Sequence, residues 1–278
     1  MSKYIDLHVH TKASDGTLSP SEVVNRAKKM DLAVIAITDH DTMAGIPEAL
    51  KEADKVGIEV LPGIEISVEY EPELHILGYF PGNSYLNLQN SLLKKLQKAR
   101  EIRNNKVINR LNELGIDISM DELEEEASGD IIGRPHIATV LKKKGYVNSV
   151  RDAFDKYLSV GAPAYFSKAK LTPQEGIMQI ADAGGIPVMA HPLTLGYSYE
   201  ELNELLAELK KIGLKGIEAY YTEHTINDTI ALLELAKKNE LLVTGGSDFH
   251  GEVKPEIEIG RGYGNLFIPF ELFEALLR

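Results

Sequence analysis

The sequence contains no cysteine, which excludes disulfide bonds, thiolate catalysis and cysteine-bound structural zinc. Any metal ion must therefore be held by histidine and carboxylate side chains. No apolar run approaches the roughly 20 residues that a membrane-spanning helix requires, and the chain leads into a strand-like pattern from its first residues. We therefore expect a cytoplasmic protein that contacts no membrane, and nothing in the sequence indicates an obligate protein partner.

Positive charge is outnumbered: 30 lysine and arginine residues stand against 42 aspartate and glutamate residues, which gives a formal net charge of -12 at pH 7. Such a protein repels nucleic-acid phosphates at long range, so binding of an extended duplex through a general basic face is disfavoured. A small anion in a locally positive pocket stays compatible with this charge. The length of 278 residues suits one α/β barrel of roughly 250 residues that carries a small insertion.

Strand-like runs alternate with helical sequence along most of the chain. Two capping boxes with proline at the first helical position, Ser19–Glu22 and Thr172–Glu175, each predict the start of a helix. The alternation and the apolar character of the strands favour parallel strands buried on both faces, in a barrel or a doubly wound sheet. The seven predicted strands are 4–10, 33–38, 58–66, 74–79, 185–190, 216–220 and 241–247.

The alternation breaks between residues 86 and 160, where two helical stretches are separated by a further capping box that begins at Ser119. We predict a helical insertion over 86–160 that roofs the active site of a barrel formed by 1–85 and 161–278. Its first helix could contact nucleic acid or present a solvated face, and the acidic residues at 122–126 favour the solvated face. The basic residues concerned are Lys94, Lys95, Lys98, Arg100, Arg103, Lys106 and Arg110.

The first predicted strand carries polar side chains on one face. The two-residue period of a strand places Asp6, His8 and His10 on the face opposite Ile5 and Leu7. Two imidazoles in this arrangement can hold one metal ion. Alone the pair is weak evidence, because a histidine on a strand is more often an ordinary hydrogen-bonded residue.

Similar side chains recur at the ends of the other predicted strands. Because the carboxyl ends of parallel strands meet on one face of a barrel, residues far apart in sequence would gather in one cleft. One ion cannot use so many protein groups, and four to six ligands per ion suggest two or three ions, of which we favour three. The candidate ligands are His8, His10, Asp15, His40, Glu65, His75, His191, Asp248 and His250.

The charge of such a cluster indicates its chemistry. Three divalent ions bring six positive charges and the carboxylates of Asp15, Glu65 and Asp248 return three, which leaves about +3 to hold a hydroxide and a phosphate. A site of this kind lowers the pKa of bridging water and aims the hydroxide at phosphorus, so hydrolysis of a phosphate ester fits best. Metals that only brace the fold are the alternative, but a core of this size needs none.

Six segments in this order resemble the polymerase and histidinol phosphatase (PHP) family. The resemblance implies a distorted seven-stranded (β/α) barrel with a trinuclear site of manganese, iron or zinc. It assigns His8, His10, Glu65 and Asp248 to the first metal, Glu65, His75 and His191 to the second, and Asp15, His40 and His250 to the third. The segments are Asp6–Thr11, Asp15-Gly16, Thr38–Asp41, Gly63–Glu65, Ala190–Pro192 and Ser247–His250.

Within the family, the insertion and the segment Gly133–His136 are similar to nucleotide phosphatases that act on 3′,5′-bisphosphates. The resemblance implies conversion of a nucleoside 3′,5′-bisphosphate to the 5′-monophosphate and phosphate, by attack of a metal-bridging hydroxide. It places Arg134 and His224 near the substrate phosphates as catalytic and binding residues, and His136 as a further binding residue. Arg134 could instead cap a helix or pair with acidic residues, and His224 could be a helix N-terminal residue.

Other functions stay open from the sequence. The same site could act as a 5′-3′ exoribonuclease on short 5′-phosphorylated RNA, as a histidinol-phosphate phosphatase, or as a non-catalytic nucleotide-binding module. We also expect Asp6, Asp39 and Asp41 to orient ligand imidazoles by accepting their free N–H groups, although Asp41 could cap a helix instead.

Overall fold

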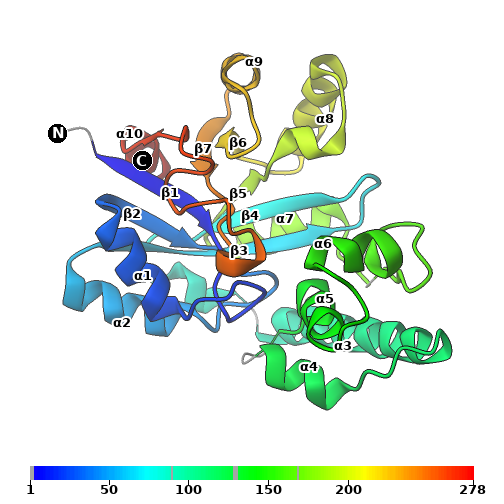
Figure 1. The fold of residues 1–278 in the computed structure, drawn as a ribbon. Helices are drawn as coiled ribbons and strands as arrows, with labels where there is room; N and C mark the ends of the chain where they lie inside the picture. Colours follow the sequence, from blue (N-terminus) through cyan, green and yellow to red (C-terminus); the bar gives the residue numbers. More distant parts are fainter. Residues whose placement is uncertain (1–2, 89, 128–130, 168) are drawn as a thin grey trace.

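The computed structural model describes residues 3–88, 90–127, 131–167 and 169–278. It is an α/β structure in which a curled sheet is surrounded by helices (Figure 1). All seven predicted strands are confirmed with small shifts of their ends, and a short eighth strand joins them. The strands are β1 (Tyr4–Val9), β2 (Leu32–Ile37), β3 (Glu59–Val68), β4 (Leu74–Tyr79), β5 (Ile186–Met189), β6 (Gly216–Tyr221), β7 (Leu242–Gly246) and β8 (Ile268–Pro269).

The strands form one sheet in the order β7-β6-β5-β4-β3-β2-β1-β8. The sheet curls until the end of β7 meets β1, where the backbone N–H of Asp248 donates to His8 O at 2.9 Å and that of His10 donates to Phe249 O at 3.0 Å. These bonds nearly close the barrel, as the expected distorted (β/α) barrel requires.

β4 differs from the expectation of parallel strands. It runs antiparallel to both β3 and β5, whereas β1–β2, β2–β3, β5–β6 and β6–β7 are parallel pairs. The connection between β3 and β4 is too short for a crossover, so β4 returns beside β3 as a hairpin. His75 therefore stands at the beginning of its strand, and this beginning lies at the same end of the barrel as the carboxyl ends of the parallel strands.

Helices cover the outside of the sheet, and their starts follow the local sequence. The capping boxes of Ser19 and Thr172 are both formed, and Ser119 and Glu122 make the reciprocal bonds of a third. The α-helices are α1 (Pro20–Lys29), α2 (Ile46–Val56), α3 (Asn90–Glu113), α4 (Met120–Ala127), α5 (Arg134–Lys143), α6 (Val150–Ala153), α7 (Pro173–Asp182), α8 (Tyr199–Lys211), α9 (Ile226–Lys238) and α10 (Glu271–Leu276). Shorter helical turns are η1 (Ser84–Asn87), η2 (Phe154–Leu158), η3 (Pro192–Leu195) and η4 (Gly251–Val253).

The helices between β4 and α7 lie together at one side of the sheet (Figure 1). They share a hydrophobic cluster that includes Val107, Leu111, Leu123 and Ile137, each fully buried, and that Ala164 also joins. The helices of this segment pack on one another through this cluster, which agrees with the absence of alternating strands and helices from its sequence. The division into a barrel and an inserted domain with the bounds 86–160 stays a prediction. In the described ranges no helix is long and apolar enough to cross a membrane.

Candidate metal centre

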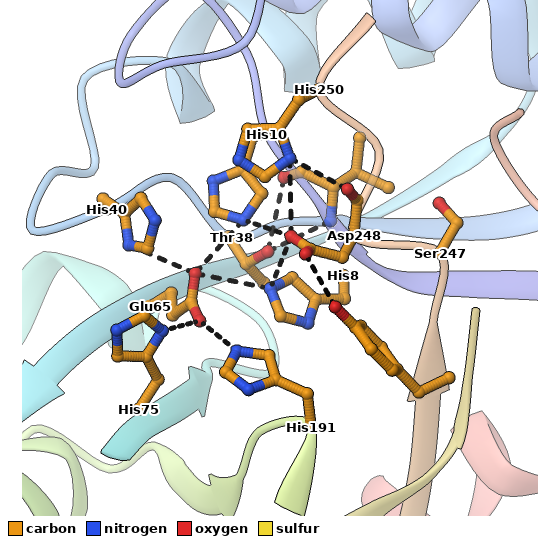
Figure 2. A network of polar contacts seen from close by, with 12 residues as sticks. His8, His10, Thr38, His40, Glu65, His75, His191, Ser247, Asp248 and His250 are labelled. Carbon is orange, nitrogen blue, oxygen red and sulfur yellow. Dashed lines mark hydrogen bonds and ion pairs between the residues drawn. The ribbon is translucent and has the colours of Figure 1, made fainter. Parts of the chain in front are cut away.

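Six imidazoles and three carboxylates meet at the end of the barrel where the parallel strands finish. β1 supplies His8, the next residue after β1 is His10, and both side chains have no solvent exposure; β3 supplies Glu65, which is 1% exposed. The remaining side chains come from the loops that follow strands and from the start of β4. The structure thus brings together all nine candidate ligands, and Figure 2 shows most of them arranged around Glu65.

The first predicted ligand group surrounds one point. His8 Nε2 lies 3.4 Å from Glu65 Oε2 and 3.5 Å from Asp248 Oδ1. His10 Nε2 lies 3.2 Å and 3.3 Å from the same two oxygen atoms. Two imidazole nitrogens therefore face two carboxylate oxygens across a gap that suits a divalent ion.

The second and third predicted groups adjoin the first. Glu65 Oε1 lies 2.7 Å from His75 Nδ1 and 3.1 Å from His191 Nε2. Asp15 lies 3.3 Å from His250 Nε2 and 3.8 Å from His40 Nε2. The grouping by mutual distance also places His10 with the Asp15 set and His40 with Glu65 and His75, so neighbouring groups share residues.

The imidazole nitrogens in this cluster fit a metal ion. Among the described residues, His8 Nε2, His10 Nε2, His40 Nδ1 and His75 Nε2 are buried without a hydrogen-bond partner. His8 donates its Nδ1 proton to Glu218 Oε1 at 3.0 Å, so the neutral ring presents a lone pair at Nε2. A lone pair facing carboxylate oxygens is repelled by them unless a proton or a metal cation lies between. The donor set, nitrogen and oxygen without sulfur, accepts zinc, manganese or iron.

The backbone is strained where it presents two of these side chains. Asp248 has φ 56° and His191 has φ 26°, values that residues with a Cβ rarely adopt. Each residue lies two positions beyond the end of a parallel strand, where the chain turns sharply. Such strain persists only when surrounding contacts hold it, and it concentrates at functional sites.

The expectation that a ligand imidazole donates directly to the carboxylate is wrong for Asp6 and Asp39, and for Asp41 it stays a prediction. Asp6 accepts from the backbone N–H groups of Ser247 at 2.9 Å and Gly260 at 2.7 Å, rather than from an imidazole. Asp41 accepts from Arg100 Nε at 2.7 Å. These carboxylates hold the loops and the α3 helix in place around the site, because buried backbone N–H groups and guanidinium groups need acceptors.

Asp39 is linked to the ligand histidine His10 through the hydroxyl of Ser14. It accepts from Ser14 Oγ at 2.6 Å, and Ser14 Oγ lies 3.5 Å from His10 Nδ1. It also accepts from Thr11 Oγ1 at 2.7 Å, which fixes the loop that leads to Asp15.

Glu218 was missed by the sequence reasoning. It is fully buried on β6, where it accepts from His8 Nδ1 and also from the backbone N–H of His191 at 2.8 Å. One carboxylate thus orients two candidate ligands, the pattern in which a carboxylate fixes the tautomer of a metal-bound histidine. A glutamate inside an otherwise apolar strand was the signal that could have revealed it.

The pKa values follow from burial and from this crowding of charges. Burial lowers the pKa of His40 to about 3, despite Glu65 and Asp15 nearby. Burial also opposes the charged form of His75, but Glu65 and Glu73 outweigh it and raise its pKa to about 9. For Asp6, burial raises the pKa to about 6. Without a metal ion the site therefore holds a mixture of neutral and protonated imidazoles beside its carboxylates.

Arg134 lies at the edge of the cluster at the start of α5. Its guanidinium group lies 3.7 Å from Glu73, donates to Leu158 O at 3.5 Å and stacks over the ring of Tyr165. It lines a cavity that His40 and His75 also line. This position is compatible with the predicted contact to a substrate phosphate.

His136 lies two residues further along α5. Its Nδ1 accepts from the backbone N–H of Gly133 at 2.9 Å, which satisfies a free donor at the start of the helix. Burial lowers its pKa, so the ring stays neutral. These contacts support a structural function in capping α5, and contact with substrate stays a prediction.

His224 lies behind Tyr221. The Tyr221 ring packs against both His191 and His224, with ring centres 5.5 Å and 5.2 Å apart, and its hydroxyl donates to Asp248 Oδ2 at 3.0 Å. His224 donates from Nδ1 to Ala219 O at 2.9 Å, so its neutral ring has an accepting nitrogen at Nε2. Neutral His224 cannot protonate a leaving oxygen in this state, and it must first take up a proton.

Lys254 is a further residue that sequence reasoning did not single out. Its ammonium group lies 2.6 Å from Asp248 Oδ2, and its side chain lines the cavity above the cluster. It follows His250 by only four residues, but a lysine in a loop gives no signal of its own in a sequence.

The family comparison agrees with this geometry. The model of the PHP domain matches residues 6–167, which is more than half of the chain. The chain belongs to the PHP family. The match begins at Asp6 and includes the loops and strands that carry His8 through His75.

Two relatives and one solved structure are similar to this chain over nearly its full length. The chain is 36% identical to a 5′-3′ exoribonuclease of Haemophilus influenzae over 90% of this chain and 91% of the relative. It is 32% identical to a 3′,5′-nucleoside bisphosphate phosphatase of Chromobacterium violaceum over 92% and 90%. Its fold matches that of a metal-dependent phosphoesterase from Bifidobacterium adolescentis with a TM-score of 0.86 at 30% identity, covering 100% of this chain and 96% of the other.

This PHP-family protein is therefore a hydrolase that acts on phosphate ester bonds. Its cluster of histidine and carboxylate side chains and its metal-dependent relatives indicate divalent metal ions as cofactors. The two relatives carry different activities, so membership of the family does not by itself determine the substrate.

Proposed function

We propose that this phosphoesterase removes the 3′-phosphate of a nucleoside 3′,5′-bisphosphate and releases the nucleoside 5′-monophosphate and inorganic phosphate. The observation that carries the proposal is the cluster of six imidazoles and three carboxylates beneath a cavity of about 370 Å³, which four of the imidazoles and all three carboxylates line. The phosphatase of Chromobacterium violaceum, with its similarity over 92% of this chain, supports the choice of substrate.

In this proposal the nine side chains hold three divalent ions, of manganese, iron or zinc, in the groups that the sequence predicted. When bound, such ions lower the pKa of a bound water and neutralise charge on the phosphate. The insertion would cover the site, with Arg100 of α3 bound to Asp41 and Arg134 of α5 facing the cavity beside His75.

The protein's own donors would hold the reacting phosphate. Arg134 and Lys254 line the two cavities at the cluster and can donate to phosphate oxygens. The oxygen of a water molecule forms a bond to phosphorus, the bond between phosphorus and the 3′-oxygen breaks, and a proton that the water loses is passed to the leaving 3′-oxygen. His224 can donate this proton only after it takes one up at Nε2, because burial lowers its pKa and its Nδ1 proton is donated to Ala219 O.

The test is release of phosphate from adenosine 3′,5′-bisphosphate by protein supplied with manganese. We expect release by the native chain and none by His10→Ala, whose missing imidazole opens the first metal group. Release by the native chain that is no greater than that of His10→Ala would contradict the proposal.

A second candidate is a 5′-3′ exoribonuclease acting on 5′-phosphorylated RNA, which the relative from Haemophilus influenzae favours. On α3 the side chains of Lys94, Lys95 and Lys98 are exposed and could guide a strand. If they do, turnover of oligonucleotides falls steeply with salt, and replacing these lysines with glutamine flattens the profile. A profile that is flat in the native chain contradicts this second candidate.

A further inference from the structure

The two carboxylate oxygens of Asp248 face different neighbours. Oδ1 lies 3.5 Å from His8 Nε2 and 3.3 Å from His10 Nε2, on the side of the first predicted metal group. Oδ2 lies 2.6 Å from the ammonium nitrogen of Lys254 and 3.0 Å from the hydroxyl of Tyr221. One oxygen of this candidate ligand is therefore turned to the cluster, while the other accepts from two hydrogen-bond donors.

The backbone of Asp248 is held by bonds of its own. Its N–H donates to His8 O at 2.9 Å, and its carbonyl oxygen accepts from His250 Nδ1 at 2.8 Å. His250 Nδ1 also lies 3.4 Å from Oδ1, but the shorter bond to the carbonyl oxygen uses its proton. These bonds fix the main chain at φ 56° but not the last torsion of the side chain, which has broad minima in aspartate. The two donors at Oδ2 therefore determine which oxygen faces the cluster.

Tyr221 is placed to serve Asp248 alone. It is the last residue of β6 and is 5% exposed, and its ring packs against His191 and His224. A buried hydroxyl group requires a partner, which Asp248 Oδ2 provides. Among the described residues, those that line the cavity above the cluster do not include Tyr221, so it acts through Asp248 rather than on a substrate.

Lys254 holds the same oxygen from the loop that follows β7. Its side chain is 35% exposed and lines the cavity above the cluster. An ammonium group has three N–H donors, so Lys254 can hold Oδ2 and still donate to a phosphate. Hydrogen bonds between an ammonium group and a carboxylate are short and strong, so this contact keeps Oδ2 occupied.

We propose that Tyr221 and Lys254 are positioning residues, which together occupy Oδ2 of Asp248 and so fix Oδ1 as the oxygen that this carboxylate offers to a divalent ion. A carboxylate that is free to turn can bind an ion through either oxygen or through both. Partners that hold a ligand in one orientation therefore raise the affinity of the site for its ion. The inference rests on the proposed function only in requiring divalent ions in the cluster, and it does not depend on the substrate.

The test is Tyr221→Phe, which keeps the aromatic ring and removes the hydroxyl. We expect its affinity for one divalent ion to fall about tenfold, measured as metal content after dialysis against graded chelator concentrations. Excess manganese should restore kcat to within about twofold of native, with KM for adenosine 3′,5′-bisphosphate unchanged. The matched control is Tyr199→Phe, whose hydroxyl donates to Asp228 Oδ1 at 2.6 Å on the surface, and it should retain the native metal content.

Two results would overturn the role of Tyr221. The first is native metal retention in Tyr221→Phe. The second is a loss of activity that excess manganese does not restore, because a residue that acts only through a metal ligand has no effect once the metal site is full.

A pair of substitutions at Lys254 tests the same oxygen and decides the proposal if Tyr221→Phe does not fold. Lys254→Gln and Lys254→Met remove the same charge, but only glutamine keeps an N–H donor. We expect Lys254→Met to bind the ion about fivefold more weakly than Lys254→Gln does. Equal metal retention by the two variants contradicts the role of the donor at Oδ2.

The same measurements separate this inference from the proposed function. A native chain that retains metal but releases no phosphate from the bisphosphate contradicts the proposed function alone, and metal retention in Tyr221→Phe still decides the positioning role. An active native chain whose metal retention equals that of Tyr221→Phe contradicts the positioning role alone. A native chain that binds no divalent ion contradicts both.

Discussion

At the scale of single residues, the orientation of His8 depends on Glu218. The carboxylate accepts the Nδ1 proton of His8 and the backbone N–H of His191, so it sets which nitrogen faces Glu65 and Asp248. Its negative charge also increases the electron density on the imidazole, which strengthens a bond to a metal ion.

Glu218→Gln should lower affinity for the most weakly held metal ion by about tenfold, since the amide keeps an acceptor but loses the charge. The measurement is metal content after dialysis against a graded series of chelator concentrations. Glu204→Gln, an exposed glutamate on α8, is the matched control and should retain the native metal content. Unchanged metal retention in Glu218→Gln would show that the carboxylate does not act on the site.

Residue types at strand ends allowed the candidate ligands to be predicted, because barrel geometry brings those ends together. The partners of those residues could not be predicted in the same way. Glu218 meets His8 across 210 positions of sequence, and Asp39 is linked to His10 through the hydroxyl of Ser14. Such pairings depend on the register and tilt of strands, which a local pattern does not contain.

At the scale of elements, the approach of β7 to β1 leaves no room for a side chain at Gly246. A Cβ there would overlap the Cβ and the backbone nitrogen of His8. Close backbone approach of this kind is a common reason for glycine in a strand.

Gly246→Ala should lower the free energy of unfolding by about 2 kcal/mol or more and displace His8, because the clash is with backbone. Denaturant unfolding and metal content measure the two effects. Gly145→Ala is the comparison. Gly145 has φ 78° and open space where a Cβ would lie, so we expect only a strain cost of about 1 kcal/mol and no loss of metal. Equal effects of the two substitutions would contradict the close packing of β7 on β1.

The helix starts offer a second test at this scale. Thr172 accepts from the backbone N–H of Glu175 at 3.2 Å, so Thr172→Ala should destabilise the protein by about 1 kcal/mol without changing activity. Thr229→Ala, inside α9, should be close to neutral because alanine is a good helix former. Thermal unfolding of both variants measures the difference, and a neutral Thr172→Ala would argue against the capping box.

Local patterns predicted the strands and capping boxes well, since both depend on neighbouring residues. The direction of β4 was predicted wrongly because a short β3–β4 connection also suits a hairpin, and alternation elsewhere suggested otherwise. The eighth strand has only two residues, Ile268 and Pro269, too few to give a periodic signal.

At the scale of the whole molecule, negative charge dominates but the substrate end is locally positive. The net charge is -12, whereas the cavity of about 260 Å³ beside the cluster is lined by Arg100, Arg103, Arg134 and Lys170 against the carboxylates of Asp15 and Glu73. This contrast favours a small phosphate ester over a long polymer, because a polymer meets the negative remainder of the surface.

Removal of metal should weaken the entire barrel. Without metal ions, Glu65, Asp15 and Asp248 would face one another in a buried site, and only the protonated part of the neighbouring imidazoles would offset their charge. We expect a chelator to lower the melting temperature by several degrees and added manganese to restore it, since a ligand that binds the folded state stabilises it. The same melting temperature with and without chelator would indicate that the cluster binds no metal tightly.

The most direct test of the central claim is metal analysis of the purified protein together with phosphate release from adenosine 3′,5′-bisphosphate. The proposal predicts close to three divalent ions per chain and phosphate release, and a coordinate loss of metal and release in His10→Ala. The claim that the nine side chains form a metal-dependent phosphatase site would be contradicted by a native chain that retains less than one ion, or that releases phosphate no faster than His10→Ala.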